Sequence, residues 1–139
     1  MIDIDIAKKL LKKEDYTLVA VKDGEVLFTS REKGIKPMYT LVKTMKEKAF
    51  GASIADRVIG RGAALLSQYL SVKEVYANLI SKSAIEVFKT QNIQYSFLES
   101  CDSIKNRDQT GLCPIETISL DLTDPLEFIK ELEMFFKSK

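Results

Sequence analysis

SIADRVIGRGAALLSQYL, residues 53–70, is the segment around which the chain is organised. Its first part is typical of a short strand that ends in Val58 and Ile59 and is interrupted by Asp56 and Arg57. Gly60 and Gly62 follow, and glycine lets the backbone turn sharply and approach a neighbouring group closely. Residues 63–66, Ala-Ala-Leu-Leu, are strong helix formers. The segment therefore predicts a strand that passes through a glycine-rich turn into a helix.

Two amphipathic helices are predicted before this segment. Residues 6–14 place isoleucine and leucine on one face and lysines elsewhere, and Asp3 or Asp5 is the candidate N-cap. Residues 38–48 repeat the pattern with Met, Leu and Val. Pro37 precedes them and fits the first helical turn, because its missing N–H costs nothing there.

A β-hairpin is predicted between the two helices. Residues 17–22 and 25–29 are rich in Val, Leu and Phe, and only Asp23-Gly24 separates them. Asp-Gly between two such runs is typical of a type I′ turn, in which both central residues have positive φ.

The rest of the chain continues the alternation of helices and strands. It contains predicted strands at 73–80 and 93–99, a helix at 81–92 capped by Ser81 or Ser83, and a last helix at 125–136 capped by Asp124. The order of helix, hairpin and then three helix–strand steps predicts an α/β fold, a three-layer α/β/α sandwich with a mixed sheet.

The composition excludes several classes of protein. With 139 residues, 45% hydrophobic and 29% charged, the chain is expected to form one globular domain over residues 1–139. Lys and Arg number 21 against 20 Asp and Glu, a net charge of +1, whereas nucleic-acid-binding surfaces carry a clear basic excess. No apolar run approaches the roughly 18 residues of a membrane helix, and the first residues lack a signal-peptide pattern. We therefore expect a cytoplasmic protein with neither nucleic acid nor membrane as partner.

Histidine is absent, and Cys101 and Cys113 are the two cysteines. Histidine is the commonest metal ligand and the usual general base. Without it, and without a Cys-x-x-Cys motif, only carboxylates remain to complete a tetrahedral zinc site. We therefore expect no metal and no cofactor, with both cysteines as free thiols in a reducing compartment.

The first candidate site lies at the end of the central predicted strand. Asp56 and Arg57 are adjacent charges where a buried strand is predicted, and such charges are costly unless they are paired or used. One interpretation is an ion pair or a helix cap. The other is that Asp56 contacts a ligand, while Gly60, Arg61 and Gly62 offer backbone amides and a guanidinium to an anion. The glycines match neither a dinucleotide fingerprint nor a P-loop.

A second candidate anion site precedes the helix at 38–48. Lys33, Gly34 and Lys36 lie directly before this helix. The N–H groups at the start of a helix attract negative charge, so Lys36 is a candidate ligand-binding residue.

A third candidate site is the polar connection at 100–118, which is long for a compact domain. Arg107 close to Cys113 would favour the thiolate and make the sulfur a nucleophile or redox group. Glu116 is a candidate acid or base, and Asn106 a candidate ligand contact. The alternative is that Cys113 is simply a small buried apolar residue.

Three motifs carry a resemblance to known proteins. The order of elements resembles the cytidine deaminase-like fold. The motifs DRVIGRGAALL (56–66), TGLCPIE (110–116) and GIKP (34–37) resemble an uncharacterised prokaryotic family of small proteins assigned to that fold. Deaminases hold zinc through His or Cys next to Ala-Glu and through Pro-Cys-x-x-Cys. The corresponding helix starts here, 34–37 and 60–63, carry none of these ligands. The resemblance implies a zinc-free fold with a pocket for an anionic or nucleotide-like ligand.

Three functional hypotheses follow. The first is a binding protein for a small anionic or nucleotide-like molecule, with Lys36, Asp56, Gly60, Arg61, Gly62, Asn106 and Arg107 as contacts. The second is an enzyme with Cys113 as nucleophile, activated by Arg107, and with Glu116 or Asp56 moving protons. The third is a structural or assembly homodimer formed through a sheet edge or an apolar helix face.

Overall fold

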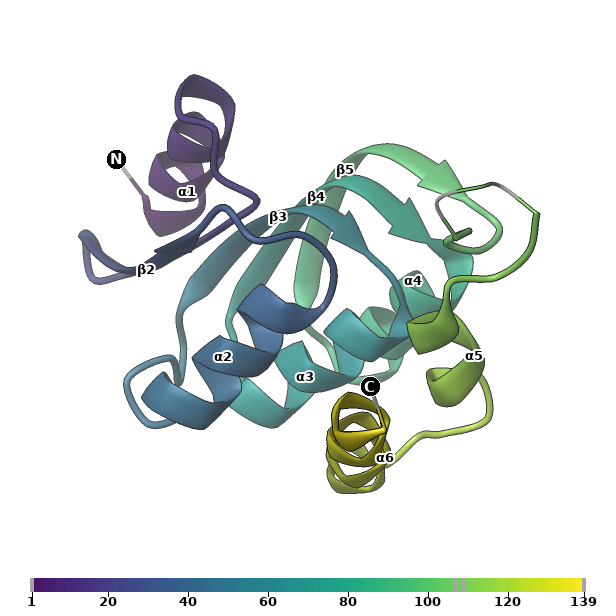
Figure 1. Ribbon diagram of the computed structural model, residues 1–139. Coiled ribbons are helices and arrows are strands. Elements are labelled where there is room, and N and C mark those ends of the chain that lie inside the picture. The colour runs from purple at the N-terminus through teal and green to yellow at the C-terminus, as the bar shows by residue number, and fades with distance from the viewer. Residues whose placement is uncertain (1, 107, 109, 139) are drawn as a thin grey trace.

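The computed structural model describes residues 2–106, 108 and 110–138 and contains a mixed sheet of five strands (Figure 1). The strand order is β2-β1-β3-β4-β5. β1 pairs antiparallel with β2 and β3, whereas β3, β4 and β5 run parallel. The strands are β1 (Leu18–Lys22), β2 (Glu25–Ser30), β3 (Ser53–Ile59), β4 (Glu74–Ser81) and β5 (Gln94–Cys101).

Helices cover both faces of this sheet (Figure 1). They are α1 (Asp3–Lys13), α2 (Lys36–Met45), α3 (Arg61–Leu70), α4 (Lys82–Thr90), α5 (Pro114–Ser119) and α6 (Pro125–Lys137). α1 packs on one face over Val19, Val21 and Ala55. The larger core lies on the other face, under α2, α3 and α4, and α6 packs against α3. The predicted three-layer sandwich with a mixed sheet is confirmed. None of the described helices is long and apolar enough to cross a membrane.

The predicted hairpin is present, but its neighbour Asp3 does not have the predicted role. Asp23 and Gly24 have φ of 51° and 81°, as a type I′ turn requires. Asp3 is the first residue of α1, and its carboxylate accepts hydrogen bonds from the amides of Asp23 and Gly24 at 2.9 and 2.8 Å. The N-cap position is Ile2, and no side chain caps the helix. The prediction of an Asp3 or Asp5 cap was therefore wrong.

The last part of the chain follows the predicted pattern with one addition. The Ser81 hydroxyl accepts from the amide of Ala84, and the Asp124 carboxylate accepts from the amide of Leu126, so both caps are confirmed. The connection predicted as a polar loop contains the short helix α5, which begins at Pro114. Proline fits this position because it needs no N–H partner in the first turn. This helix forms one wall of the cavity described next.

Candidate functional site

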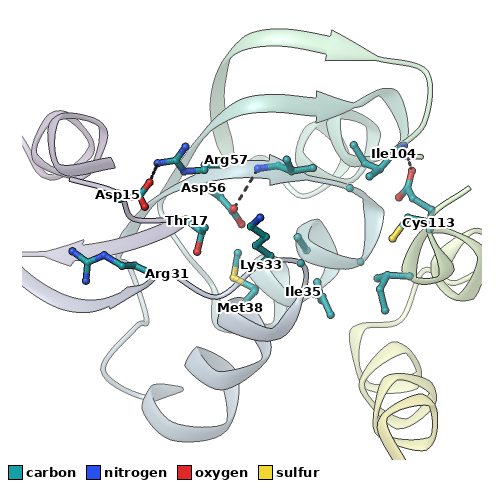
Figure 2. A pocket seen from close by; sticks show the side chains of 17 residues that line it. Asp15, Thr17, Arg31, Lys33, Ile35, Met38, Asp56, Arg57, Ile104 and Cys113 are labelled. Atoms are coloured by element: carbon teal, nitrogen blue, oxygen red, sulfur yellow. Dashed lines mark hydrogen bonds and ion pairs between the residues drawn. The ribbon is translucent and has the colours of Figure 1, made fainter. Parts of the chain in front are cut away.

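A cavity of ≈580 Å³ lies at the carboxyl end of β3 (Figure 2). In Figure 2, Arg31 and Asp15 lie at one side of it, Ile104 and Cys113 at the other, and Asp56 between them. Its polar groups come from the start of β1, the loop before α2, the end of β3 and the start of α5. Its apolar wall consists of Ile35, Met38, Val58, Ala63, Ile104 and Ile115. Segments far apart in the sequence thus meet around one cavity.

Asp56 is a buried carboxyl that faces this cavity. Asp56 is only 7% exposed, and its carboxyl accepts a long hydrogen bond, 3.4 Å, from the amide of Val58. Burial raises its pKa to about 7, although the backbone amides of Val58 and Arg57 partly oppose the shift. No described Lys or Arg forms an ion pair with it. The carboxyl is thus removed from bulk water, and no cation of the described residues pairs with it.

Arg57 does not neutralise Asp56, because adjacent residues of a strand point to opposite faces. Its Nε donates to the carbonyl of Tyr16 at 2.6 Å, and its terminal nitrogen lies 3.5 Å from Asp15. The predicted ion pair therefore exists for Arg57, with Asp15 as its partner, and does not involve Asp56. Arg57 fixes the chain that enters β1, and Asp56 is left to the cavity.

Lys33 and Arg31 supply positive charge at the cavity. The Arg31 guanidinium lies over the ring of Tyr16, 4.5 Å from its centroid. Lys33 is exposed and forms no hydrogen bond or ion pair with any residue in the described part of the chain. The loop that carries Arg31 and Lys33 is fixed by Thr17, whose hydroxyl donates to the carbonyls of Ser30 and Glu32. Lys36, the predicted cation, is exposed and does not line the cavity.

Glu116 closes the end of the cavity formed by α3. It is 6% exposed, and its two carboxylate oxygens accept from the amide of Arg61 at 2.8 Å and from the amide of Ile104 at 3.0 Å. The carboxylate therefore already occupies the start of α3, where a bound anion was predicted. Both of its oxygens are engaged by backbone amides.

The lack of a side chain at Gly60 and Gly62 lets other parts of the chain pack closely against them. A Cβ on Gly60 would lie 2.7 Å from Oε1 of Glu116. A Cβ on Gly62 would lie 2.6 Å from Cζ of Phe128 and 2.8 Å from Cγ2 of Ile115. The close approach predicted from Gly-x-Gly exists, but the approaching groups belong to α5 and α6. Both glycines also border the cavity.

Arg61 points away from the cavity and binds other parts of the chain. It is 7% exposed, and its guanidinium donates to the carbonyls of Ser119 and Leu122 and to the hydroxyl of Ser83. These bonds hold the segment after α5 against α3 and α4. The side chain is not among the groups that line the cavity.

The residues predicted as site residues in the polar connection do not all lie at the cavity. Cys113 is half-buried and lines the cavity, and its amide donates to the carbonyl of Ile104. Asn106 does not line it, since its side chain exchanges hydrogen bonds with Thr110. Arg107 lies outside the described residues. Within the described residues, no group of three Asp, Glu or Cys side chains is placed to hold a metal ion.

Sequence reasoning missed part of the site. Lys33 belonged to the predicted anion site before α2, although Lys36 was chosen there as the ligand contact. Arg31 was missed, and its place in the same loop, two residues before Lys33, could have indicated it. Thr17 carries no local signal, since it reaches the cavity only through the antiparallel pairing of β1 with β3.

Residues 6–136 match the family described as a domain of unknown function, DUF1893 (TM1506). The chain is similar to the crystal structure of a DUF1893 family protein from Thermotoga maritima, with a TM-score of 0.87 and 26% identity over 95% of this chain and 88% of that one. It is less similar to RibD from Acinetobacter baumannii, with a TM-score of 0.45 and 18% identity over 68% of this chain and 32% of that one, which supports no conclusion about function. No curated protein sequence matches the chain.

Proposed function

The chain belongs to the DUF1893 family, and on that premise we propose that it binds a small anionic or nucleotide-like molecule in the cavity at the end of β3. The observation that carries the proposal is Asp56, a buried carboxyl that faces the cavity without a cationic partner among the described residues. A buried carboxylate without a partner is costly, and such groups are concentrated at functional sites. A ligand N–H that donates to Asp56 would offset that cost.

The positive charge that would attract an anionic ligand comes from Arg31 and Lys33, in the loop before α2. Lys33 is free of internal partners within the described chain, and Arg31 is held only by the face of Tyr16. Each can reach an anionic group without first losing an ion pair to another described side chain. The apolar wall formed by Ile35, Met38 and Val58 then suits the uncharged body of the ligand.

The resemblance to the cytidine deaminase-like fold supports the same location. In open α/β sheets, ligands bind beyond the carboxyl ends of the strands, where helices begin. The start of α3 is filled by Glu116, so the side of α2, with Lys33, is the side we assign to the anion.

Native and denaturing mass spectrometry of freshly purified protein test the proposal. We expect an additional mass in the native spectrum that is lost on denaturation and is absent from Asp56→Asn. Asp15→Asn is the matched control, because Asp15 is an exposed carboxylate at the outer side of the same cavity. A bare native mass, together with no thermal shift from the nucleoside monophosphates, cytidine or inorganic phosphate, would contradict the proposal.

A second candidate function is an enzyme with Cys113 as its nucleophile. The observation that favours it is that the half-buried Cys113 and Asp56 line the same cavity. Because both oxygens of Glu116 accept backbone hydrogen bonds, Asp56 is the carboxyl available to move a proton. We expect iodoacetamide to label Cys113 before Cys101, whose pKa is raised by burial and by Glu116. Equal, slow labelling of both would argue against this function.

A further inference from the structure

The two edges of the sheet differ in how they are protected. In β2, the register with β1 shifts between Ala20 and Val21, so that Leu27 has no opposite residue. Such a bulge twists an edge strand and discourages pairing with another chain. β5 keeps one regular parallel register with β4 along its length, from Gln94 to Cys101. Its outer edge pairs with no described strand.

β5 also exposes apolar side chains at its centre. Leu98 is 70% exposed and Phe97 is 41% exposed. Leu98 shares the sheet face of Tyr76, on which α1 packs, but α1 packs mainly on β1 and β3 and less on β4, and Leu98 is left largely exposed. Phe97 stacks on Tyr95 on the opposite face. Glu99 is the only charged residue of the strand. Natural edge strands usually carry charges that discourage pairing, so a long, regular and nearly uncharged edge is a pairing site.

We propose that two copies of this chain associate through antiparallel pairing of their β5 strands, with Phe97 on the two-fold axis. An axis normal to the sheet keeps each face continuous, so residues that lie opposite each other must share a face. With Phe97 opposite Phe97, Ser96 lies opposite Leu98 of the second copy, and Tyr95 opposite Glu99. The two sheets then form one continuous sheet.

The side chains of β5 are complementary to themselves in this register. Glu99 faces the Tyr95 hydroxyl, which can donate to it, and no like charges meet. The two Phe97 rings meet on one face, and Leu98 gains cover on the face that α1 leaves open. A two-fold interface repeats each contact twice, so the Tyr95–Glu99 pair occurs on both sides of the axis. These contacts favour a second copy over an unrelated extended peptide.

Sedimentation and light scattering measure the association. We expect the mass of two chains for the wild type and of one chain for Phe97→Lys, because two ammonium groups would meet at the axis. Leu126→Lys is the matched control, since Leu126 is an exposed apolar residue of α6, and it should remain a dimer. The mass of one chain for the wild type at the highest attainable concentration would overturn the proposal.

Cross-linking tests the register independently of how well the lysine variant folds. Opposite residues of an antiparallel pair have Cα atoms about 4.5–5.5 Å apart, within the range that a disulfide spans. In a Cys101→Ser, Cys113→Ser background, Phe97→Cys should form a linked dimer with oxidised glutathione, and Leu126→Cys should not. Equal linking of the two variants would exclude Phe97 from the axis.

Discussion

Glu116 and Asp56 are two similarly buried carboxyls that line one cavity but differ in their hydrogen bonds. Glu116 accepts short hydrogen bonds from two backbone amides, and it thereby joins α5 and Ile104 to the start of α3. Asp56 has one long bond from Val58, and burial raises its pKa to about 7. Burial alone therefore does not identify a ligand-binding carboxyl. The carboxyl that forms no ion pair with any described residue and accepts no short hydrogen bond from one is the carboxyl available to a ligand.

The largest expected effect is the response of stability to pH through Asp56. Its pKa rises from 3.8 in the unfolded chain to about 7 in the folded chain, so the folded state binds more protons between these values. The contribution of Asp56 to stability then falls as pH rises from about 4 to 7, by a few kcal/mol in all. Urea unfolding at a series of pH values should show this fall in the wild type and a smaller one in Asp56→Asn. Identical slopes in the two proteins would show that Asp56 is not titrating in this range.

Glu116→Gln should lower the free energy of unfolding by about 1–3 kcal/mol, because the amide group of glutamine turns a donor toward a backbone donor. Glu131→Gln, a change on the exposed face of α6, is the control and should have almost no effect. Chemical denaturation measures both. If Glu116→Gln left the free energy of unfolding unchanged, the amides of Arg61 and Ile104 would have found other partners. Glu116 and Asp56 would then no longer differ in how strongly the chain depends on their hydrogen bonds.

Gly60→Ala sharpens the comparison, because the added methyl group would come closest to the carboxylate of Glu116. The new methyl group would lie 2.7 Å from Oε1 and 3.1 Å from Cγ1 of Ile104, so the carboxylate must shift. We expect a loss of about 1–3 kcal/mol, as for an overpacked core position. Thermal unfolding should show that Glu116→Gln and Gly60→Ala together cost less than the sum of the two, since both act on one contact. If the losses of the two single variants add up in the double variant, the Gly60→Ala change does not act through Glu116.

Lys33→Ala should leave stability within about 0.5 kcal/mol of the wild type, because Lys33 is exposed. Its effect should be on affinity, a loss of about tenfold for an anionic ligand, which corresponds to about 1.4 kcal/mol. Lys36→Ala is the matched control, since Lys36 stands outside the cavity. Titration calorimetry with the co-purified molecule or an active nucleoside monophosphate measures both. Equal losses of affinity in Lys33→Ala and Lys36→Ala would show that the anion does not bind at Lys33.

Local patterns in the sequence predicted most of the fold. The turn at Asp23-Gly24, the caps at Ser81 and Asp124 and the order of strands and helices depend on residues close together in the chain, and each was confirmed. Asp56 and Cys113 were both selected as site residues, and the structure places both at the cavity. Sequence patterns can thus indicate polar residues that line a cavity, here one within a strand and one directly before a helix.

The directions of the side chains could not be predicted in the same way. Whether Arg61 reaches a ligand depends on Ser119 and Leu122, which lie far along the chain. The space beside Gly60 is filled by Glu116, whose hydrogen bond to Arg61 also joins distant residues. These contacts form only when α5 docks on α3. A glycine motif therefore predicts a close approach but does not identify the group that approaches.

The pKa of Asp56 is the most direct test of the contrast between the two carboxyls. A pH titration of the aspartate side-chain carbons by NMR, with Asp56→Asn to assign the signal, measures it without a known ligand. We predict a carboxyl that titrates near pH 7 in the free protein and at lower pH once a bound N–H donor faces it. An Asp56 signal already ionised at pH 5 in the free protein would show that the chain itself satisfies this carboxylate, and would contradict its assignment to a ligand.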